Sequence, residues 1–243
     1  MDKILALLPM TKGAEYFKHY FADWQDVDVM SLDQGPEIIT TRVDYALAGF
    51  DSVKKAIEAE KAGYKALVVL CLGDPNLFSL REAVSIPVLG PLQTTWHFCS
   101  MLANRFSIIS PIDIEELAKQ DWEDLWARYE FKENLVTARQ IPFKESLEEI
   151  GKLSMQKPIP EQLVQPALET CIQAIEQDGA PAITFGCAFI SGVVDEVIVR
   201  LRAKGYRIPI INPVPFTVEV ARFLIRMKLS HSAKTFPLAS VFQ

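Results

Sequence analysis

The chain has 243 residues, of which 49% are hydrophobic and 23% are charged, and its formal net charge at pH 7 is −6. A chain of this length and composition can bury one large core or two modest ones, which excludes a disordered protein. The acidic balance leaves no basic stripe for a phosphate backbone, so nucleic acid is excluded as a partner and a small-molecule substrate is favoured.

The apolar segments are too short to cross a membrane. The first ten residues, MDKILALLPM, are interrupted by Pro9, and no later apolar run approaches the roughly 20 residues of a membrane helix. We therefore expect a cytoplasmic protein that binds no membrane. Its four cysteines are expected to be free thiols, and a metal site is disfavoured because there is no Cys-x-x-Cys pair and the three histidines are scattered.

Short strand-like runs alternate with helical runs along the whole chain. Strands are expected over residues 3–10, 27–32, 65–72, 86–90, 106–110, 133–141, 181–187 and 208–212. Helices are expected over residues 14–24, 52–64, 76–84, 94–105, 114–131, 161–179, 193–206 and 217–227. Such alternation predicts an α/β protein with parallel sheets and right-handed crossovers.

Two segments of the chain repeat each other. EKAGYKALVVLC from Glu60 and EQDGAPAITFGC from Glu176 share Glu, Gly, an apolar strand and Cys, with the same eight-residue step from glycine to cysteine. IPVLGPLQTT from Ile86 and IPIINPVPFT from Ile208 then follow in the same order. We expect two similar subdomains related by a pseudo-twofold axis. The first comprises residues 1–95 plus 215–243, and the second residues 96–214.

Cys71 and Cys187 each end one of the repeated strands. Ligands of open α/β sheets bind beyond the carboxyl ends of the strands, so we expect an active site in the cleft between the subdomains, with one cysteine on either wall. The helix that follows each cysteine is expected to lower the pKa of its thiol. A thiolate and a thiol on opposite walls can remove a proton from one face of a carbon and return one to the other face, which inverts the carbon.

These segments carry a family resemblance. CLGDPNLFSLREAVSIPVLG from Cys71, together with GCAFI from Gly186 and IPIINPV from Ile208, resembles the aspartate/glutamate/hydantoin racemase superfamily, nearest its hydantoin racemase branch. The resemblance extends over most of the chain, including QGPEIITT near Gln34. It implies two α/β subdomains and racemisation by Cys71 and Cys187 without metal or pyridoxal phosphate.

The resemblance also implies substrate-binding residues. The backbone amides after each cysteine, at Leu72, Gly73, Ala188 and Phe189, are expected to hold the substrate's carboxylate or carbonyl group. Ser110 falls where relatives have a threonine that lines the site. The first strand lacks the Asn-Pro-Asn of relatives, which leaves Thr11 as the expected substrate-binding side chain there.

The residues beside the two cysteines also bear on the substrate. Leu72 and Ala188 are apolar where amino-acid racemases of the superfamily have polar residues, and Phe189 is bulky where glycine is common. A site with few polar groups is expected to prefer a carbon that neighbouring amide or imide carbonyls already acidify, as in a hydantoin. A homo-oligomer is compatible with the sequence.

Other interpretations stay open at this point. On the same fold, the chain could resemble a maleate isomerase or an arylmalonate decarboxylase, although the presence of both cysteines argues against the decarboxylase. It could also be a non-catalytic, two-lobed protein that binds a small acid. The remaining conspicuous residues are expected to have structural roles: Cys99 and Cys171 in the core, Trp122 and Trp126 in packing, His97 at the surface or as a cap, and Asp74 as the cap of the next helix.

Overall fold

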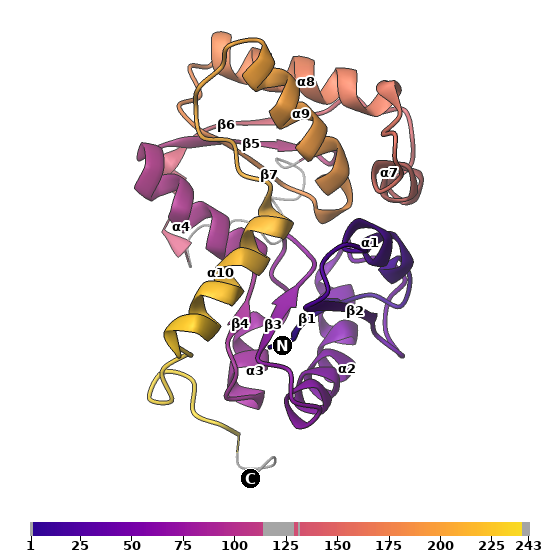
Figure 1. Cartoon of the computed structure of the whole chain (residues 1–243), viewed down its shortest axis with the longest axis vertical. Helices are drawn as coiled ribbons and strands as arrows, with labels where there is room; N and C mark the ends of the chain where they lie inside the picture. Colours follow the sequence, from indigo (N-terminus) through magenta and orange to yellow (C-terminus); the bar gives the residue numbers. More distant parts are fainter. Residues whose placement is uncertain (1, 114–128, 131, 240–243) are drawn as a thin grey trace. The chain divides into compact units, whose positions relative to one another are not determined.

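The structure is a computed structural model that describes residues 2–113, 129–130 and 132–239. It has two parallel β-sheets with helices between the strands, which confirms the predicted α/β class (Figure 1). The chain divides into two compact units. The first unit contains Met1–Pro91 and Phe216–Gln243, and the second contains Leu92–Pro215. The expected division into subdomains at 95/96 and 214/215 stays a prediction.

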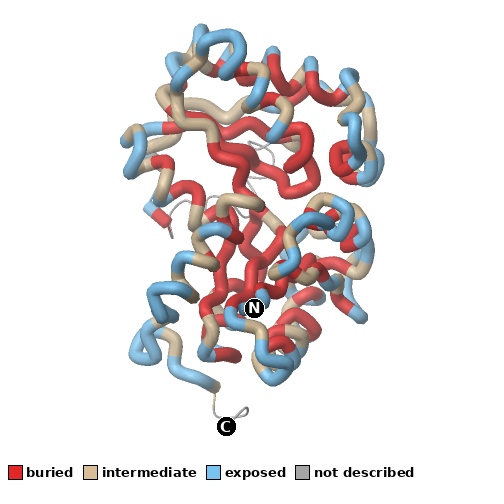
Figure 2. The backbone as a smooth tube through the Cα atoms, viewed as in Figure 1, coloured by how far each residue is buried: buried red, intermediate tan, exposed pale blue. Residues whose placement is uncertain are grey.

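The first unit is built on a four-stranded sheet of order β2-β1-β3-β4 in which all pairs are parallel. Its elements are β1 (Ile4–Leu8), α1 (Ala14–Tyr20), β2 (Val27–Ser31), α2 (Arg42–Lys61), β3 (Ala66–Val69), α3 (Leu77–Ala83) and β4 (Val88–Leu89). Most of α10 (Pro213–Met227) also belongs to it. The central strands β1 and β3 are buried along their whole length (Figure 2).

Helices α2 and α3 cover one face of this sheet. Alternate residues of β1 and β3, including Leu5, Leu7, Leu67 and Val69, form one hydrophobic cluster with residues of the two helices. The helix residues of this cluster are Ala48, Ala56, Ala59, Leu77, Leu80 and Ala83. A strand that is buried on both faces has an unbroken run of apolar residues, as seen in LALL at residues 5–8 and VVL at residues 68–70.

The second unit has a three-stranded parallel sheet of order β6-β5-β7. Its elements are α4 (Pro91–Ala103, mostly in this unit), β5 (Phe106–Ser110), η2 (Lys132–Asn134), β6 (Leu135–Gln140), α7 (Leu147–Ser154), α8 (Glu161–Glu176), β7 (Ile183–Phe185), η3 (Ala188–Ile190) and α9 (Ser191–Ala203). Helices α8 and α9 lie side by side over the sheet (Figure 1).

The two sheets repeat one strand order. In the first unit, β3 lies between β1 and β4. In the second unit, β7 has the corresponding place: it pairs with β5 on one side, and on the other side its residue Ile183 forms a parallel bridge with Ile210. The turns before β3 and β7 both contain a glycine with positive φ, 91° at Gly63 and 71° at Gly179. The sequence repeat therefore corresponds to a repeated βα arrangement within each unit. The pseudo-twofold axis stays a prediction.

Three expected elements differ in the structure. Helix α2 begins ten residues before the expected start at 52, because Thr41 and Asp44 form a capping box in which each side chain accepts from the other's backbone N–H. The strand expected over 208–212 is reduced to one bridge, since the flanking Pro209 and Pro213 have no N–H to donate. The helix expected over 114–131, with Trp122 and Trp126, falls almost entirely outside the described residues.

Within the described part of the chain, no helix is both long and apolar enough to span a membrane. All four cysteines are free.

The C-terminal segment covers the edge strand of the first sheet. Nε2 of His231 lies 2.9 Å from the backbone N of Val88, which donates to it, and Arg81 Nε donates to Val88 O at 3.1 Å. The rings of Phe78 and Phe236 pack 5.7 Å apart, with the Arg81 guanidinium within 5.6 Å of each ring centroid. Partners of this kind protect an edge strand from pairing with another chain.

This contact makes stability depend on pH. Burial, with a contribution from the charge of Arg81, lowers the pKa of His231 to about 4. In the unfolded chain His231 is protonated below its ordinary pKa of 6.5, whereas in the folded chain it stays neutral down to about pH 4. Protonation therefore favours the unfolded chain between these values. The stability is fully present above pH 6.5 and falls as the pH drops towards 4. Because the ring is partly exposed, we expect only about 1 kcal/mol between pH 7 and pH 5.

Urea unfolding at pH 7 and pH 5 checks this expectation. The wild-type protein should lose about 1 kcal/mol more over this interval than His231→Gln, whose neutral side chain can still accept from Val88. Equal losses in the two proteins would show that folding does not lower the pKa of His231.

Candidate active site

Cys71 lies at the carboxyl edge of the first sheet. The backbone N of Leu70 donates to Leu7 O at 2.8 Å, so the strand ladder ends one residue before the cysteine. A tight turn follows, in which the backbone N of Asp74 donates to Cys71 O at 3.1 Å and Asp74 and Asn76 have positive φ. Aspartate and asparagine tolerate this conformation better than other side chains. The turn leaves Cys71 partly exposed, while Leu72 is buried.

Thr11 lies at the same edge of the sheet, just after β1. Its backbone N and its hydroxyl group both donate to Pro36 O, at 3.0 Å and 3.3 Å. The hydroxyl oxygen keeps lone pairs that can accept a hydrogen bond from a substrate N–H. Thr11 is therefore held by the loop that follows β2.

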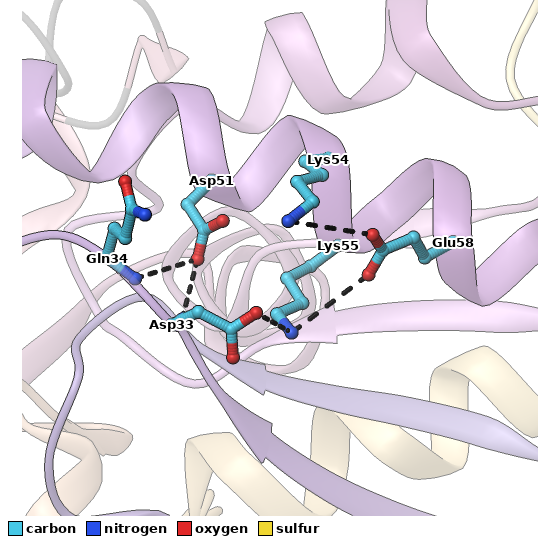
Figure 3. Close-up of polar contacts among 6 residues, drawn as sticks. All are labelled: Asp33, Gln34, Asp51, Lys54, Lys55 and Glu58. Carbon is cyan, nitrogen blue, oxygen red and sulfur yellow. Dashed lines mark hydrogen bonds and ion pairs between the residues drawn. The ribbon is translucent and has the colours of Figure 1, made fainter.

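That loop is in turn fastened to helix α2 (Figure 3). Oδ2 of Asp51, a residue only 4% exposed, accepts from the backbone N of Asp33 at 2.6 Å and from that of Gln34 at 3.2 Å. Lys55 binds the Asp33 carboxylate at 2.7 Å and lies 4.0 Å from Glu58. A buried carboxylate that receives two backbone N–H groups gives the loop one defined position, and with it Thr11.

The surroundings of Cys71 favour the protonated thiol. Desolvation by burial raises the pKa of Cys71 to about 11, and the nearby carboxylate of Asp74 adds to the increase. The backbone N–H of Gly73 donates to the sulfur and acts in the opposite direction. The expectation that this pKa is lowered was wrong, because desolvation outweighs the hydrogen bond that lowers it. Helix α3 begins only at Leu77, six residues after the cysteine.

Cys187 lies at the carboxyl edge of the second sheet. The backbone N of Gly186 donates to Ile109 O at 2.9 Å, which ends the pairing of β7 with β5. Cys187 itself is the N-cap residue of η3, and α9 begins at Ser191 directly after this turn. Its side chain is 9% exposed. Here the helical turn follows the cysteine at once, so N–H groups at the start of the turn lie next to it.

The residues after Cys187 are held by side-chain hydrogen bonds. Ser191 Oγ donates to Ala188 O at 2.8 Å, and Ser154 Oγ, from the end of α7, donates to Phe189 O. Both Ala188 and Phe189 are buried. These bonds hold the carbonyl groups of the turn that follows Cys187.

Ser110 ends β5, the strand next to β7. It is fully buried, and its Oγ accepts from the backbone N of Ile112 at 3.1 Å. The expected site residues therefore form two sets. Thr11, Cys71, Leu72 and Gly73 gather at the carboxyl edge of the first sheet, and Ser110, Cys187, Ala188 and Phe189 at that of the second. That the two sets face one cleft stays a prediction.

The residues expected to have structural roles are placed as follows. Cys99 and Cys171 are fully buried in helices, which confirms their assignment to the core, and His97 is exposed on α4. The expectation that Asp74 caps the next helix was wrong, because the N-cap residue of α3 is Asn76. The Asp74 carboxyl group instead packs on Gly90, where an added Cβ would lie 2.3 Å from its Cγ. Within the described residues, no three potential ligands gather to hold a metal ion.

Two further residues of the Cys71 side were missed in the sequence. Tyr45 from the first turn of α2 contacts Gly73, and Asn76 binds the backbone of Tyr45. The segment TTRVDY contains the sequence signal for Tyr45. Thr41 and Asp44 have the spacing of a capping box, which predicts a helix that starts at residue 42 and contains Tyr45.

Known proteins of one family resemble this chain in sequence. The family model described as Asp/Glu/Hydantoin racemase matches residues 14–221. A hydantoin racemase from Pseudomonas sp. (strain NS671) is 29% identical over 232 residues, which cover 94% of this chain and 86% of the relative.

Solved structures of allantoin racemases have the same fold. The enzyme from Klebsiella pneumoniae matches with a TM-score of 0.81 and 21% identity, covering 99% of this chain and 94% of its own. The one from Pseudomonas fluorescens matches with a TM-score of 0.79 and 17% identity, covering 98% and 97%.

Proposed function

Because the chain belongs to the Asp/Glu/hydantoin racemase family and is an isomerase of the racemase type, we propose that it inverts a carbon next to a carbonyl group with Cys71 and Cys187 as its acid and base. The observation that carries the proposal is that each cysteine lies two residues after its strand, β3 or β7, and that these strands correspond in two sheets with the same strand order. No cofactor takes part in the proposed reaction.

The proposed chemistry is a proton transfer on each face of one carbon. The thiolate of one cysteine takes the proton from the substrate carbon, and the electron pair of the broken C–H bond moves into the carbonyl group to give an enolate. The thiol of the other cysteine then donates its proton to the opposite face, and the carbonyl group reforms. Atoms and charge balance, and the two cysteines end with their protonation states exchanged. Cys71, whose pKa is raised to about 11, is the thiol in the resting enzyme.

The surroundings of the cysteines favour a substrate of the hydantoin type. Leu72, Ala188 and Phe189 offer no charged side chain for a free ammonium group, while the backbone N–H groups of the two turns can bind carbonyl oxygens. A hydantoin carbon lies next to an amide carbonyl and is far more acidic than a carbon next to an ionised carboxylate. Allantoin is itself a hydantoin with a ureido group, so the relatives' names point to one class of ring.

The proposed reaction also needs free thiols. All four cysteines are free in the structure, and a reducing compartment such as the cytoplasm would keep them so.

Incubation with single enantiomers of 5-substituted hydantoins and of allantoin in deuterated water tests the proposal. The optical rotation should decay to zero while one deuterium enters at the stereocentre, faster than in the absence of enzyme. Failure to accelerate exchange in any hydantoin would overturn the proposed substrate class. Free aspartate and glutamate serve as comparison substrates and should exchange more slowly.

The raised pKa of Cys71 predicts a pH dependence for the Cys187→Ser variant. In this variant only Cys71 can exchange the substrate proton with solvent, and it must be a thiolate to accept that proton. With a pKa of about 11, the thiolate fraction, and with it the rate of deuterium exchange, should rise about tenfold per pH unit from pH 7 to pH 10. NMR measurement of exchange at fixed substrate concentration checks this, and a rate independent of pH over this range would contradict it.

A further inference from the structure

The turn that follows Cys71 is held in place by helix α2. We propose that Tyr45 is a positioning residue for Cys71: together with Asn76 it holds the turn from Cys71 to Asn76 in the shape that directs the Gly73 amide at the Cys71 sulfur. The catalytic meaning of this inference rests on the proposed function. The placement of the turn itself can be tested without any substrate.

The first support is the close approach of Tyr45 to Gly73. A Cβ added at Gly73 would lie 1.9 Å from Tyr45 Oη, 2.9 Å from Cζ and 3.2 Å from Cε1. The hydroxyl end of the phenol ring therefore rests directly on the Cα of Gly73, and a residue with a side chain does not fit beneath it. A side chain at this position must displace either the Tyr45 ring or the turn itself.

The second support is at the other end of the turn. Nδ2 of Asn76 donates to the backbone O of Tyr45 at 3.0 Å, and Asn76 has a φ of 57°. A Cβ added at Gly49, one turn further along α2, would lie 3.1 Å from Asn76 Oδ1. The turn is thus tied to α2 at Gly73 by packing and at Asn76 by a hydrogen bond.

Helix α2 is itself well anchored near Tyr45. The capping box of Thr41 and Asp44 fixes the start of the helix immediately before it, with the backbone N of Thr41 donating to Asp44 Oδ2 at 2.8 Å. Less than two turns later, the buried Asp51 binds the loop that positions Thr11. One helix segment therefore positions both the Thr11 loop and the Cys71 turn.

The position of the turn matters for the chemistry of the sulfur. Burial and the Asp74 carboxylate favour the thiol, and the Gly73 N–H is the interaction that favours the thiolate. If the turn shifts, this N–H leaves the sulfur and the thiolate loses its hydrogen bond. Cys71 would then act more slowly as a base, although substrate binding elsewhere would be little changed.

A double-mutant cycle between Gly73 and Tyr45 tests the inference. The cycle uses the Cys187→Ser background, in which Cys71 is the only partly exposed thiol, since Cys99 and Cys171 are fully buried. The rate of Cys71 alkylation by iodoacetamide is measured by mass spectrometry from pH 7 to pH 12. Gly73→Ala should raise the midpoint of this profile by about one pH unit, a tenfold loss of thiolate below it. In the Tyr45→Ala background, where the added methyl group has room, the same substitution should shift the midpoint by much less.

Matched controls lie at the opposite end of β3. Gly63 has no atom within 4 Å of an added Cβ, and Tyr64 donates to Asp28 Oδ2 at 2.7 Å. Gly63→Ala and Tyr64→Ala should lower Tm without moving the alkylation midpoint. The inference is overturned if Gly73→Ala leaves the midpoint unchanged, or if it shifts the midpoint equally with and without Tyr45.

If Gly73→Ala does not fold, the racemisation kinetics of Tyr45 variants test the positioning role of Tyr45 independently. Tyr45→Ala should lower kcat for racemisation at least tenfold with little change in KM, while Tyr45→Phe, which keeps the ring on Gly73, should stay within about threefold of wild type. A Tyr45→Phe variant as impaired as Tyr45→Ala, with a raised KM, would make Tyr45 a substrate contact and overturn its positioning role. Absence of racemisation in the wild type would refute the proposed function and leave the alkylation cycle to decide this inference.

Discussion

Replacing Cys71 or Cys187 by serine is expected to reduce racemisation by about 10²–10⁴-fold, the range that a lost general acid or base usually costs. Serine has nearly the shape of cysteine, but its hydroxyl group hardly ionises at neutral pH and cannot take a proton from carbon. Both residues follow buried strands, so the substitution should leave the fold intact. Polarimetry with each enantiomer as the starting material measures the loss.

The single variants should also differ from each other in a diagnostic way. The remaining cysteine can remove and return a proton only on its own face, so each variant should exchange deuterium into one enantiomer without inverting it. The two variants should act on opposite enantiomers. Cys171→Ala, at a fully buried cysteine of α8, is the matched control and should racemise at the wild-type rate. Near wild-type racemisation by either strand-end variant would exclude the two-cysteine mechanism.

Gly192→Ala is expected to cause the largest loss of stability. An added Cβ would lie 1.9 Å from the backbone O of Ser154 and 3.0 Å from its carbonyl carbon. Because backbone rather than a flexible side chain must move, we expect the upper part of the overpacking range, about 3 kcal/mol, or roughly 6–12 °C in Tm. The displaced segment, the end of α7, also provides the Ser154 hydroxyl bound to Phe189 O. The turn after Cys187 should therefore be disturbed as well.

Calorimetry of Gly192→Ala and Gly205→Ala separates close packing from backbone strain. Gly205 has a φ of 96° with no atom within 4 Å of an added Cβ, so its substitution costs only the left-handed conformation, about 1–2 kcal/mol. A smaller Tm loss for Gly192→Ala than for Gly205→Ala would show that α7 can move away from α9 at little cost.

The class of fold and the positions of β3 and β7 could be predicted from the sequence for identifiable reasons, although both strands end two residues before their cysteines. Buried parallel strands such as ALVV of β3 are unbroken apolar runs, and the glycines before β3 and β7 mark helix ends by their positive φ. The placement of Cys71 and Cys187 after these strands follows from the same signals.

The early start of α2 could not be found from hydrophobic periodicity. Val43, Leu47 and Phe50 are 66%, 59% and 81% exposed, so the apolar residues in this part of the helix do not mark its buried side. The hydrogen bonds of the capping box determine the start instead. This error also hid Tyr45 and its contact with Gly73.

The direction of the Cys71 pKa shift was equally out of reach of the sequence. It depends on how much water reaches the sulfur and on the Asp74 carboxylate that the turn folds back towards it. Neither quantity can be read from residue spacing, because both arise from the three-dimensional course of the five residues between Cys71 and α3.

The discontinuity of the first unit has a consequence for synthesis on the ribosome. The second unit is a single stretch, Leu92–Pro215, whereas the first needs Phe216–Gln243 in addition to the opening part of the chain. Until His231 has been translated, the nascent β4 has an open edge at Val88. Of the two units, the one whose translation begins earlier is therefore the one that is completed later.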